Sequence, residues 1–274
     1  MGGTDSKSGL GRASEVRIVT CNVQRADISR TRRQVAWLVG VGADVLVLTE
    51  VSAGESGAVL AGLLADAGYG VLLPSPASND RYRVLVASRD PEPTAIDVGA
   101  GVLGHRCVAA RMSLPAGEIG VVGLYVPSRG PKELRNQAKR AFQDRVAAML
   151  PDVGRGIGGG GPVVVAGDLN VVEPAHDPRY AVFGSWEYDF YREFGRAGFD
   201  DAFRVMEPTK MDYSWFGRPS AEGLRNGYRI DHAFVNRAHR AAVVECRYDH
   251  SVRTAGLTDH SAMSVTLDLS VTTA

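Results

Sequence analysis

The sequence predicts a mixed α/β (α+β) fold, because two kinds of segment alternate along its 274 residues. Short runs rich in β-branched residues indicate strands, and the longer amphipathic or Ala/Leu-rich stretches between them indicate helices. A chain of this length can bury a large core as one sizeable domain or as two ordinary ones. The sequence shows no repeat and no convincing domain boundary, so a single domain over residues 15–272 is preferred. Residues 1–14 are polar and rich in Gly and Ser, which predicts a flexible N-terminal tail.

The first half of the chain alternates strands and helices. Residues 16–20 alternate apolar and polar side chains as a strand does, and residues 30–39 have helical spacing. Residues 45–48 form a continuous apolar run that is typical of a core strand. A helix is expected over residues 56–67, because Gly68 follows it as a C-terminal cap. Three more apolar runs predict strands at residues 84–87, 107–112 and 120–126.

The second half begins with a long helix. Pro131 suits the first turn of a helix over residues 132–150, and Pro151 is expected to stop it. Its predicted apolar positions are Leu134, Ala138, Phe142 and Val146. The glycine-rich residues 154–161 are followed at once by a buried-type strand at 162–166, so they are interpreted as a loop rather than a linker between domains. The remaining expected elements are a helix at 186–197 and strands at 229–235, 241–246 and 261–269.

Charge and cysteine content exclude several classes of protein. The chain has 31 Lys and Arg against 31 Asp and Glu, so no overall basic field draws it to nucleic acid or to an anionic membrane. Cys21, Cys107 and Cys246 are isolated and odd in number, which argues against a disulfide framework or a structural zinc site. With no signal peptide and no apolar run of membrane-spanning length, a cytoplasmic protein without membrane association or an obligate protein partner is expected.

Two apolar runs end near an acid. Glu50 follows one and Asp168 the other, and a carboxylate at the end of a core strand can help to form a partly dry metal site. For each acid the alternative is a solvated strand end. Asp168 and Asn170 lie two residues apart, so a carboxylate and an amide face the same side of an extended turn, as a phosphoryl group and its attacking water require. An Asx turn that only ends the strand is the alternative.

A late segment pairs a carboxylate with an imidazole. Asp259 and His260 precede the last strand, and His is the side chain best suited to proton transfer near neutral pH. Within residues 229–235 the period of two sets Asp231 opposite His232. Asp231 is therefore expected to face the site, and His232 to pack inside.

Taken in order, these segments resemble the endonuclease/exonuclease/phosphatase superfamily, which has the DNase I-like fold, and within it the exonuclease III group of apurinic/apyrimidinic endonucleases. The resemblance extends from about residue 16 to residue 267 and implies a four-layer sandwich of two mixed β-sheets flanked by helices. Further similarity to the exonuclease III group lies in residues 198–204, 213–216 and 226–231. The motifs that carry it are Thr20-Cys21-Asn22, Val47-Leu48-Thr49-Glu50, Leu124-Tyr125-Val126-Pro127, Gly167-Asp168-Leu169-Asn170, Arg229-Ile230-Asp231 and Thr258-Asp259-His260-Ser261.

The resemblance implies a divalent metal. It assigns Glu50 as a ligand, with Asn22 and Asp259 close by. A site built from carboxylate and amide oxygens suits Mg2+ or Mn2+ better than zinc. Mg2+ or Mn2+ is therefore the expected cofactor.

The resemblance also implies the catalytic set. Asp168 and Asn170 would position the attacking water and the phosphate, and Tyr125 would contact the scissile phosphate or the leaving group. His260, held by Asp231, would hydrogen-bond a phosphoryl oxygen or help to manage the proton. In-line displacement at phosphorus needs an oriented water, charge neutralisation and help for the leaving alkoxide, and this set supplies groups for each.

Substrate binding is expected at rings and basic side chains. Trp215 matches a tryptophan that lines the abasic-site pocket in the resembled family, and Tyr228 lies in a shared motif; an aromatic core cluster is the alternative for these rings. Arg129 belongs to a run of basic residues that could contact phosphates, with an ordinary solvated helix face as the alternative. The members of that run are Arg129, Lys132, Arg135, Lys139, Arg140 and Arg145.

Three functions follow from the residues and the resemblance. The favoured one is a Mg2+-dependent phosphodiester hydrolase, an exonuclease III-like DNA nuclease that cuts at abasic sites or processes 3′ ends. The alternative is a phosphatase or phosphodiesterase that acts on a small nucleotide, a sugar phosphate or a lipid headgroup, which the neutral net charge favours. A binding module that retains the fold without activity is the third, and the complete catalytic set argues against it.

Overall fold

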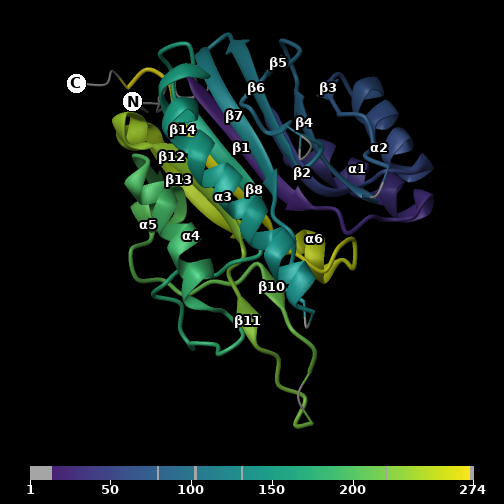
Figure 1. The fold of residues 1–274 in the computed structure, drawn as a ribbon. Coiled ribbons are helices and arrows are strands. Elements are labelled where there is room, and N and C mark those ends of the chain that lie inside the picture. Colours follow the sequence, from purple (N-terminus) through teal and green to yellow (C-terminus); the bar gives the residue numbers. More distant parts are fainter. Residues whose placement is uncertain (1–13, 79, 102–103, 131, 220, 272–274) are drawn as a thin grey trace, which may run out of the picture.

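Two six-stranded β-sheets pack face to face, and helices cover their outer faces (Figure 1). The computed structural model describes residues 14–271 apart from positions 79, 102–103, 131 and 220. The tail predicted over residues 1–14 therefore lies outside the described residues except for its last position. The expected four-layer sandwich of two mixed sheets flanked by helices is confirmed. In the part of the chain that the structure describes, no helix is long and apolar enough to cross a membrane.

The first sheet is built around the N-terminal strand. β1 (Glu15–Asn22) is parallel to β2 (Val45–Ser52) and antiparallel to β14 (Ala262–Asp268), so the sheet is mixed. Helices α1 (Ile28–Val41) and α2 (Glu55–Asp66) cover its outer face, where Leu38 and Leu60 pack in one cluster with Leu46. In spatial order its strands are β13 (Val243–Asp249), β14 (Ala262–Asp268), β1 (Glu15–Asn22), β2 (Val45–Ser52), β4 (Tyr82–Ser88) and β3 (Gly70–Leu72).

The second sheet has the same architecture. β7 (Gly117–Tyr125) is parallel to β8 (Val163–Asp168), and the other neighbouring strands are antiparallel. Helices α3 (Glu133–Gly156) and α4 (Ser185–Arg196) cover its outer face through Phe142 and Phe190. In spatial order its strands are β5 (Thr94–Ile96), β6 (Cys107–Leu114), β7 (Gly117–Tyr125), β8 (Val163–Asp168), β12 (Asp231–Asn236) and β9 (Phe199–Asp201). Shorter elements are α5 (Ala202–Met206), β10 (Trp215–Phe216), β11 (Gly227–Tyr228), the 3-10 helix η2 (Arg237–Ala242) and α6 (Ser251–Thr254).

One apolar cluster fills the space between the two sheets. Val47 and Val84 of the first sheet belong to it together with Val121 and Val164 of the second. The sheets approach closely at Gly123, where an added Cβ would lie 2.6 Å from a methyl carbon of Val84. Burial of this kind contributes about 25 cal/mol per Å² of apolar surface and is the main force that holds the two sheets together.

Helix α3 differs from the prediction in length and in orientation. It continues through Pro151 to Gly156, so the expected stop at Pro151 is wrong. A proline inside a helix costs about 3 kcal/mol. Beyond it, Val153 and Ile157 are 1% and 4% exposed, and burying two such side chains stabilises by roughly 1.5–3 kcal/mol each, which offsets that cost. The predicted apolar face is also wrong in the first turns, because Leu134 is 79% exposed whereas Lys139 is fully buried.

Strand ends collect the polar residues at one edge of the sandwich. Asn22, Tyr125 and Asp168 lie at the carboxyl ends of β1, β7 and β8, and the parallel register pairs Tyr125 with Asp168. β12 runs antiparallel to β8 and begins opposite it, so that Asp231 pairs with Asp168. His260 precedes β14, which runs antiparallel to β1 and therefore starts at the same edge. The topology brings together residues that are up to 238 positions apart (260 minus 22).

Candidate active site

The turn after β8 holds Asp168 and Asn170 in a fixed arrangement. Gly167 has a φ of 143°, and a Cβ there would lie 2.0 Å from the carbonyl oxygen of Leu124, so only glycine fits. The backbone N–H of Asn170 donates to Asp168 Oδ1 at 2.9 Å, which is an Asx-turn bond. The Asn170 side chain also donates from Nδ2 to Asp168 Oδ2 at 3.1 Å and to the carbonyl of Val126 at 2.9 Å. The turn thus ends the strand and also orients both side chains.

Asn22 joins this turn from the first sheet. Its Nδ2 donates to Asp168 Oδ2 at 3.0 Å, and its Oδ1 accepts from the backbone N–H of Gln24 at 2.8 Å. The Thr258 hydroxyl donates to the Asn22 carbonyl at 2.7 Å. Asn22 is 1% exposed, so these bonds fix its position inside the site.

Glu50 and Tyr125 form a second contact between the sheets. The Tyr125 hydroxyl donates to Glu50 Oε1 at 2.7 Å. The pairing of β2 with β4 shifts register next to Glu50, whose φ of 54° is in the left-handed region that non-glycine residues seldom adopt. The carboxylate is consequently held against the other sheet by an unusual backbone conformation. Burial and the charges of Glu50 and Asp168 raise the pKa of Tyr125 well above its usual range, so its hydroxyl keeps its proton.

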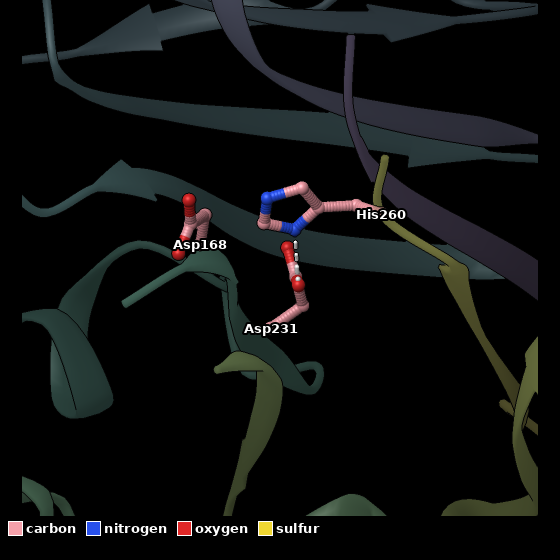
Figure 2. Close-up of side chains that lie close together, drawn as sticks. All are labelled: Asp168, Asp231 and His260. Atoms are coloured by element: carbon pink, nitrogen blue, oxygen red, sulfur yellow. Dashed lines mark hydrogen bonds and ion pairs between the residues drawn. The ribbon is translucent and has the colours of Figure 1, made fainter. Parts of the chain in front are cut away.

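Asp231 and His260 form a charged pair in the centre of the site (Figure 2). His260 Nδ1 lies 2.7 Å from Asp231 Oδ2, and both side chains are buried. Burial alone would lower the pKa of His260, but the charge and hydrogen bond of Asp231 outweigh it and raise the pKa to about 10. The Ser214 hydroxyl oxygen accepts from the backbone N–H of Asp231 at 3.1 Å, and the Tyr248 hydroxyl donates to its carbonyl at 2.6 Å.

The carboxylates outnumber the positive charges around Asp168. Burial, followed by the charges of Asp231 and Glu50, raises the pKa of the Asp168 carboxyl, and only the His260 charge and local hydrogen bonds act in the other direction. Asp231 Oδ1 is a buried carboxylate oxygen to which the described residues donate no hydrogen bond. An excess of negative charge with an unsatisfied oxygen is the environment that a divalent cation relieves, so the residues present fit one.

The ligand-type side chains that the structure brings close together are not the residues that the sequence assigned to a metal. Ligand atoms of Asp168, Asp231 and His260 lie within 4.8 Å of one another. Asp231 holds the imidazole through Nδ1 and raises its pKa to about 10, so the ring carries a proton on both nitrogens and has no lone pair for a cation. We therefore interpret this group as a hydrogen-bond network, with the carboxylate oxygens of Glu50, Asp231 and Asp168 as the available cation ligands.

Asp259 and the aromatic residues form one rim of the site. Asp259 Oδ2 accepts from Trp215 Nε1 at 3.0 Å, and Asp259 Oδ1 lies 4.0 Å from His260 Nε2. Trp215 also pairs with His260 in an isolated β-bridge, and its ring lies 5.4 Å from that of Tyr228. Both rings are half-buried, so each has a solvent-facing part as well as packing contacts. No hydrogen bond or ion pair among the described residues links Asp259 to Glu50 or Asn22 directly.

Among the described residues, no hydrogen bond or ion pair joins Arg129 to Glu50, Asp168 or Asp231. Its Nη1 donates to Glu187 Oε2 at 3.1 Å and to the carbonyl of Val182, and its side chain is 35% exposed. Lys139, from the same basic run, is fully buried and bound to Glu187, so the expectation that it could contact a phosphate is wrong. Its position among the buried residues of α3 is the reason.

Several residues of the site were not found by sequence analysis. Arg106 lies 4.5 Å above the Tyr125 ring and donates to Asp80 through Nε and Nη2. Ser214 accepts from Asp231, and Glu187 binds Arg129 and Lys139. The shared motif at residues 213–216 was a signal for Ser214, but no pattern distinguishes Arg106 or Glu187 from surface charges.

Comparisons with known proteins show the family and the fold of the chain. A sequence profile of the Endonuclease/Exonuclease/phosphatase family matches residues 19–260. A 3′ phosphatase from Neisseria, solved with a product DNA hairpin, is 23% identical, with a TM-score of 0.76 over 92% of this chain and 99% of its own. An AP endonuclease from Archaeoglobus fulgidus is 23% identical, with a TM-score of 0.74 and the same coverage. An AP endonuclease from Leishmania major is 20% identical, with a TM-score of 0.73 over 93% of this chain and 88% of its own. No curated protein sequence matches. At these identities the solved structures show a common fold.

Proposed function

The chain belongs to the endonuclease/exonuclease/phosphatase family of phosphoric-ester hydrolases, and from this premise we propose that it is a divalent-metal-dependent DNA nuclease that cleaves at abasic sites or processes 3′ ends. The observation that carries the proposal is the convergence of the Asp168–Asn170 turn with the Asp231–His260 pair at one edge of the two sheets. Similarity in fold to a 3′ phosphatase bound to DNA and to two AP endonucleases supports DNA as the substrate.

The catalytic roles follow from the contacts. Asp168 orients the attacking water and accepts its proton, for which a raised pKa is suited. The water oxygen bonds to phosphorus on the side opposite the leaving oxygen, whose bond to phosphorus breaks. Asn170 holds Asp168 in place and so helps to position the water and the phosphate, and protonated His260 donates to a phosphoryl oxygen as negative charge develops on it. The Tyr125 hydroxyl contacts the leaving group or the phosphate.

Glu50 is the proposed principal metal ligand, with Asn22 and Asp259 nearby and Asp231 Oδ1 as a further oxygen. When bound, Mg2+ or Mn2+ would neutralise charge on the phosphoryl oxygens and the leaving alkoxide. Hard oxygen donors favour these ions over zinc. Binding of the cation requires the carboxylates of the site to be deprotonated, because a protonated carboxyl group is a poor ligand.

The rim groups are proposed to bind the nucleic acid. Trp215 and Tyr228 present half-buried rings next to His260, where a base or a base-free sugar can stack. Arg129 is the basic residue that we propose to contact a backbone phosphate, with its guanidinium oriented by Glu187. Contacts of this kind position the substrate without reading its sequence.

An incision assay tests the function. A duplex with one abasic site and a second duplex with a 3′-phosphate end are incubated with the enzyme and Mg2+, and the products are separated by length. Cleavage next to the abasic site or release of the 3′ phosphate is expected, and the Asp168→Asn variant is the matched control. Absence of both products at an equimolar ratio of enzyme to DNA would refute the proposed substrate class.

The second candidate is a phosphatase or phosphodiesterase for a small phosphoester. It is favoured by the net charge of zero, since DNA-binding proteins commonly carry an excess of basic residues. A panel of nucleotides, sugar phosphates and lipid headgroups, assayed for released phosphate, distinguishes it. A turnover rate on any of these compounds that exceeds the rate on DNA would favour this candidate over the nuclease.

We also propose that residues 15–272 act as one catalytic domain, because a single apolar cluster joins both sheets. A reducing compartment such as the cytoplasm is the proposed location, since Cys21, Cys107 and Cys246 are buried free thiols. Expression of residues 15–272 alone with full activity would support the domain assignment.

A further inference from the structure

A buried ion pair lies directly behind the catalytic turn. Lys139 of α3 and Glu187 of α4 are both fully buried, and Lys139 Nζ lies 2.5 Å from Glu187 Oε1. The ring of Trp186 lies 5.6 Å from the ammonium and helps to cover it. Charged residues are almost never fully buried unless they are paired, and a buried pair is weak as a source of stability. The other contacts of the two residues therefore indicate a role for the pair besides stability.

The remaining contact of Lys139 is with the catalytic turn. Its Nζ donates to the backbone carbonyl of Asn170 at 2.8 Å. Asn170 has a φ of 49°, a conformation that non-glycine residues seldom adopt and that neighbouring contacts must hold. The side chain of the same residue binds Asp168 Oδ2. Lys139 thus fixes the backbone of Asn170, the residue whose side-chain amide donates to Asp168.

Glu187 holds the lysine in place and extends the network to the rim. Its Oε2 accepts from the backbone N–H of Gly184 at 2.9 Å and from Arg129 Nη1 at 3.1 Å. The carboxylate therefore receives donors from three segments, and its orientation is fixed by the start of its own helix. Because the carboxylate is held in one orientation, its short, charge-assisted hydrogen bond also holds the Lys139 ammonium in place.

We propose that Lys139 and Glu187 are positioning residues for catalysis, which set the backbone of Asn170 and through it the relative placement of the Asn170 amide and the Asp168 carboxylate. The inference rests on the proposed function insofar as Asn170 acts on a phosphoester. Neither Lys139 nor Glu187 touches the substrate. Through Asn170 their effect is on the rate of the chemical step, since misplacement by about 1 Å can lower a rate by roughly 10²-fold; the bond of Glu187 to Arg129 affects substrate binding separately.

The variants are chosen to separate positioning from stability. Lys139→Met leaves the buried Glu187 Oε1 without its ammonium, with only Arg129 and the Gly184 N–H on the other oxygen, and is expected to lower the melting temperature. The double variant Lys139→Met/Glu187→Met leaves no unpaired buried charge, so most of the melting temperature returns. The carbonyl of Asn170 still lacks its donor, so kcat of the double variant is expected to stay roughly 10²-fold below the wild type, whereas any rise in KM reports the loss of Glu187 beside Arg129. Arg192→Met removes an exposed ion pair with Asp189 on the same helix and should change neither quantity.

A mutant cycle and an NMR measurement complete the test. In an Asn170→Ala background, Lys139→Met is expected to lower kcat by less than about threefold, because its effect passes through Asn170. The backbone and side-chain amide signals of Asn170 are expected to shift in the double variant and to stay in place in Arg192→Met. If the wild type cleaves neither DNA substrate, the proposed function fails, and the Asn170 signals then decide this inference alone.

Two experimental results would overturn the inference. A double variant with the kcat and the Asn170 signals of the wild type would show that the pair is only structural. Should the double variant not fold, Glu187→Gln serves in its place, since it keeps the shape of the network and weakens the hold on the ammonium. A fall in kcat of at least about tenfold is expected for it, and a wild-type kcat would overturn the inference.

Discussion

Acidification is expected to weaken the fold through Glu173, a buried carboxylate below the active site. Glu173 accepts from Arg204 Nε at 2.6 Å and from Arg229 Nε at 3.0 Å, and it is 3% exposed. Burial alone would raise its pKa, but the bonds and charges of the two arginines outweigh burial and lower the pKa to about 2. In the unfolded chain the pKa returns to about 4.3. The folded state therefore binds the proton less readily than the unfolded state does.

The magnitude follows from this difference. A gap of roughly two units corresponds to about 3 kcal/mol of unfolding free energy at pH 7, which is an upper value because the arginines interact with other acids as well. The contribution is fully present above the unfolded pKa and is lost as the pH falls toward the folded pKa. At pH 3 the unfolded carboxylate is largely protonated and the folded one is not, so about 2 kcal/mol of the contribution is already lost.

Urea unfolding followed by circular dichroism at pH 7, 5 and 3 measures this effect in the wild type and in Glu173→Gln. The variant is expected to be less stable at pH 7, and the difference between the two proteins should shrink by about 2 kcal/mol at pH 3. Other carboxylates also titrate in this range, but they are common to both proteins and cancel in the difference. A difference that is constant from pH 7 to pH 3 would refute the assignment of a lowered pKa to Glu173.

Four further predictions concern the site. Asp168→Asn is expected to lower kcat by roughly 10²–10⁴-fold while the protein stays folded, because relief of a charge that burial among carboxylates disfavours offsets part of the hydrogen bonding that the amide loses; near-normal turnover would remove Asp168 from its role. His260→Ala should lower kcat by roughly 10²–10³-fold in the same assay, since a preorganised donor to the developing charge is lost, and a change in KM alone would contradict this. Gly167→Ala should destabilise the fold by roughly 2 kcal/mol or more, measured by thermal unfolding, because its Cβ would lie 2.0 Å from the Leu124 carbonyl oxygen; an unchanged melting temperature would show that the turn relaxes. Chelation by EDTA should abolish activity and Mg2+ or Mn2+ should restore it, whereas full activity in EDTA would exclude the proposed metal.

The long strands were predictable from sequence because their signal is local. The apolar run at residues 45–48 and the run before Asp168 lie in β2 and β8, which are covered on both faces. Strands of this kind show continuous apolar residues whatever their neighbours are. Strands β3 and β5, with three residues each, carry no such run, and they exist only because β4 and β6 offer them edges to pair with. Their formation depends on tertiary contacts that no local pattern records.

The site was predictable only in part. Asp168 and Glu50 stand out because an acid ends an apolar run, and the resemblance to a family supplied the pairing of Asp231 with His260. The structure adds what lies behind these groups. Arg106 above Tyr125 and the Ser214 hydroxyl at Asp231 are single polar residues whose partners lie 19 and 17 positions away (125 minus 106, and 231 minus 214). No local pattern marks Arg106, and Ser214 is marked only by the motif at residues 213–216 that the resembled family shares.

Helix α3 shows why the prediction failed nearest to the chemistry. Its buried stripe has regular helical spacing, but it is polar at its N-terminal end and, apart from Gln143, apolar from Phe142 onward; its members are Asn136, Lys139, Phe142, Gln143, Val146, Met149, Leu150 and Val153. The apolar half packs on the second sheet, where only shape and hydrophobicity matter. The polar half faces the loops at the catalytic edge, whose backbone groups need partners: Asn136 accepts from the N–H of Gly130, and Lys139 donates to the carbonyl of Asn170. A search for apolar periodicity therefore locates the structural half of such a helix and misplaces the half that supports the site.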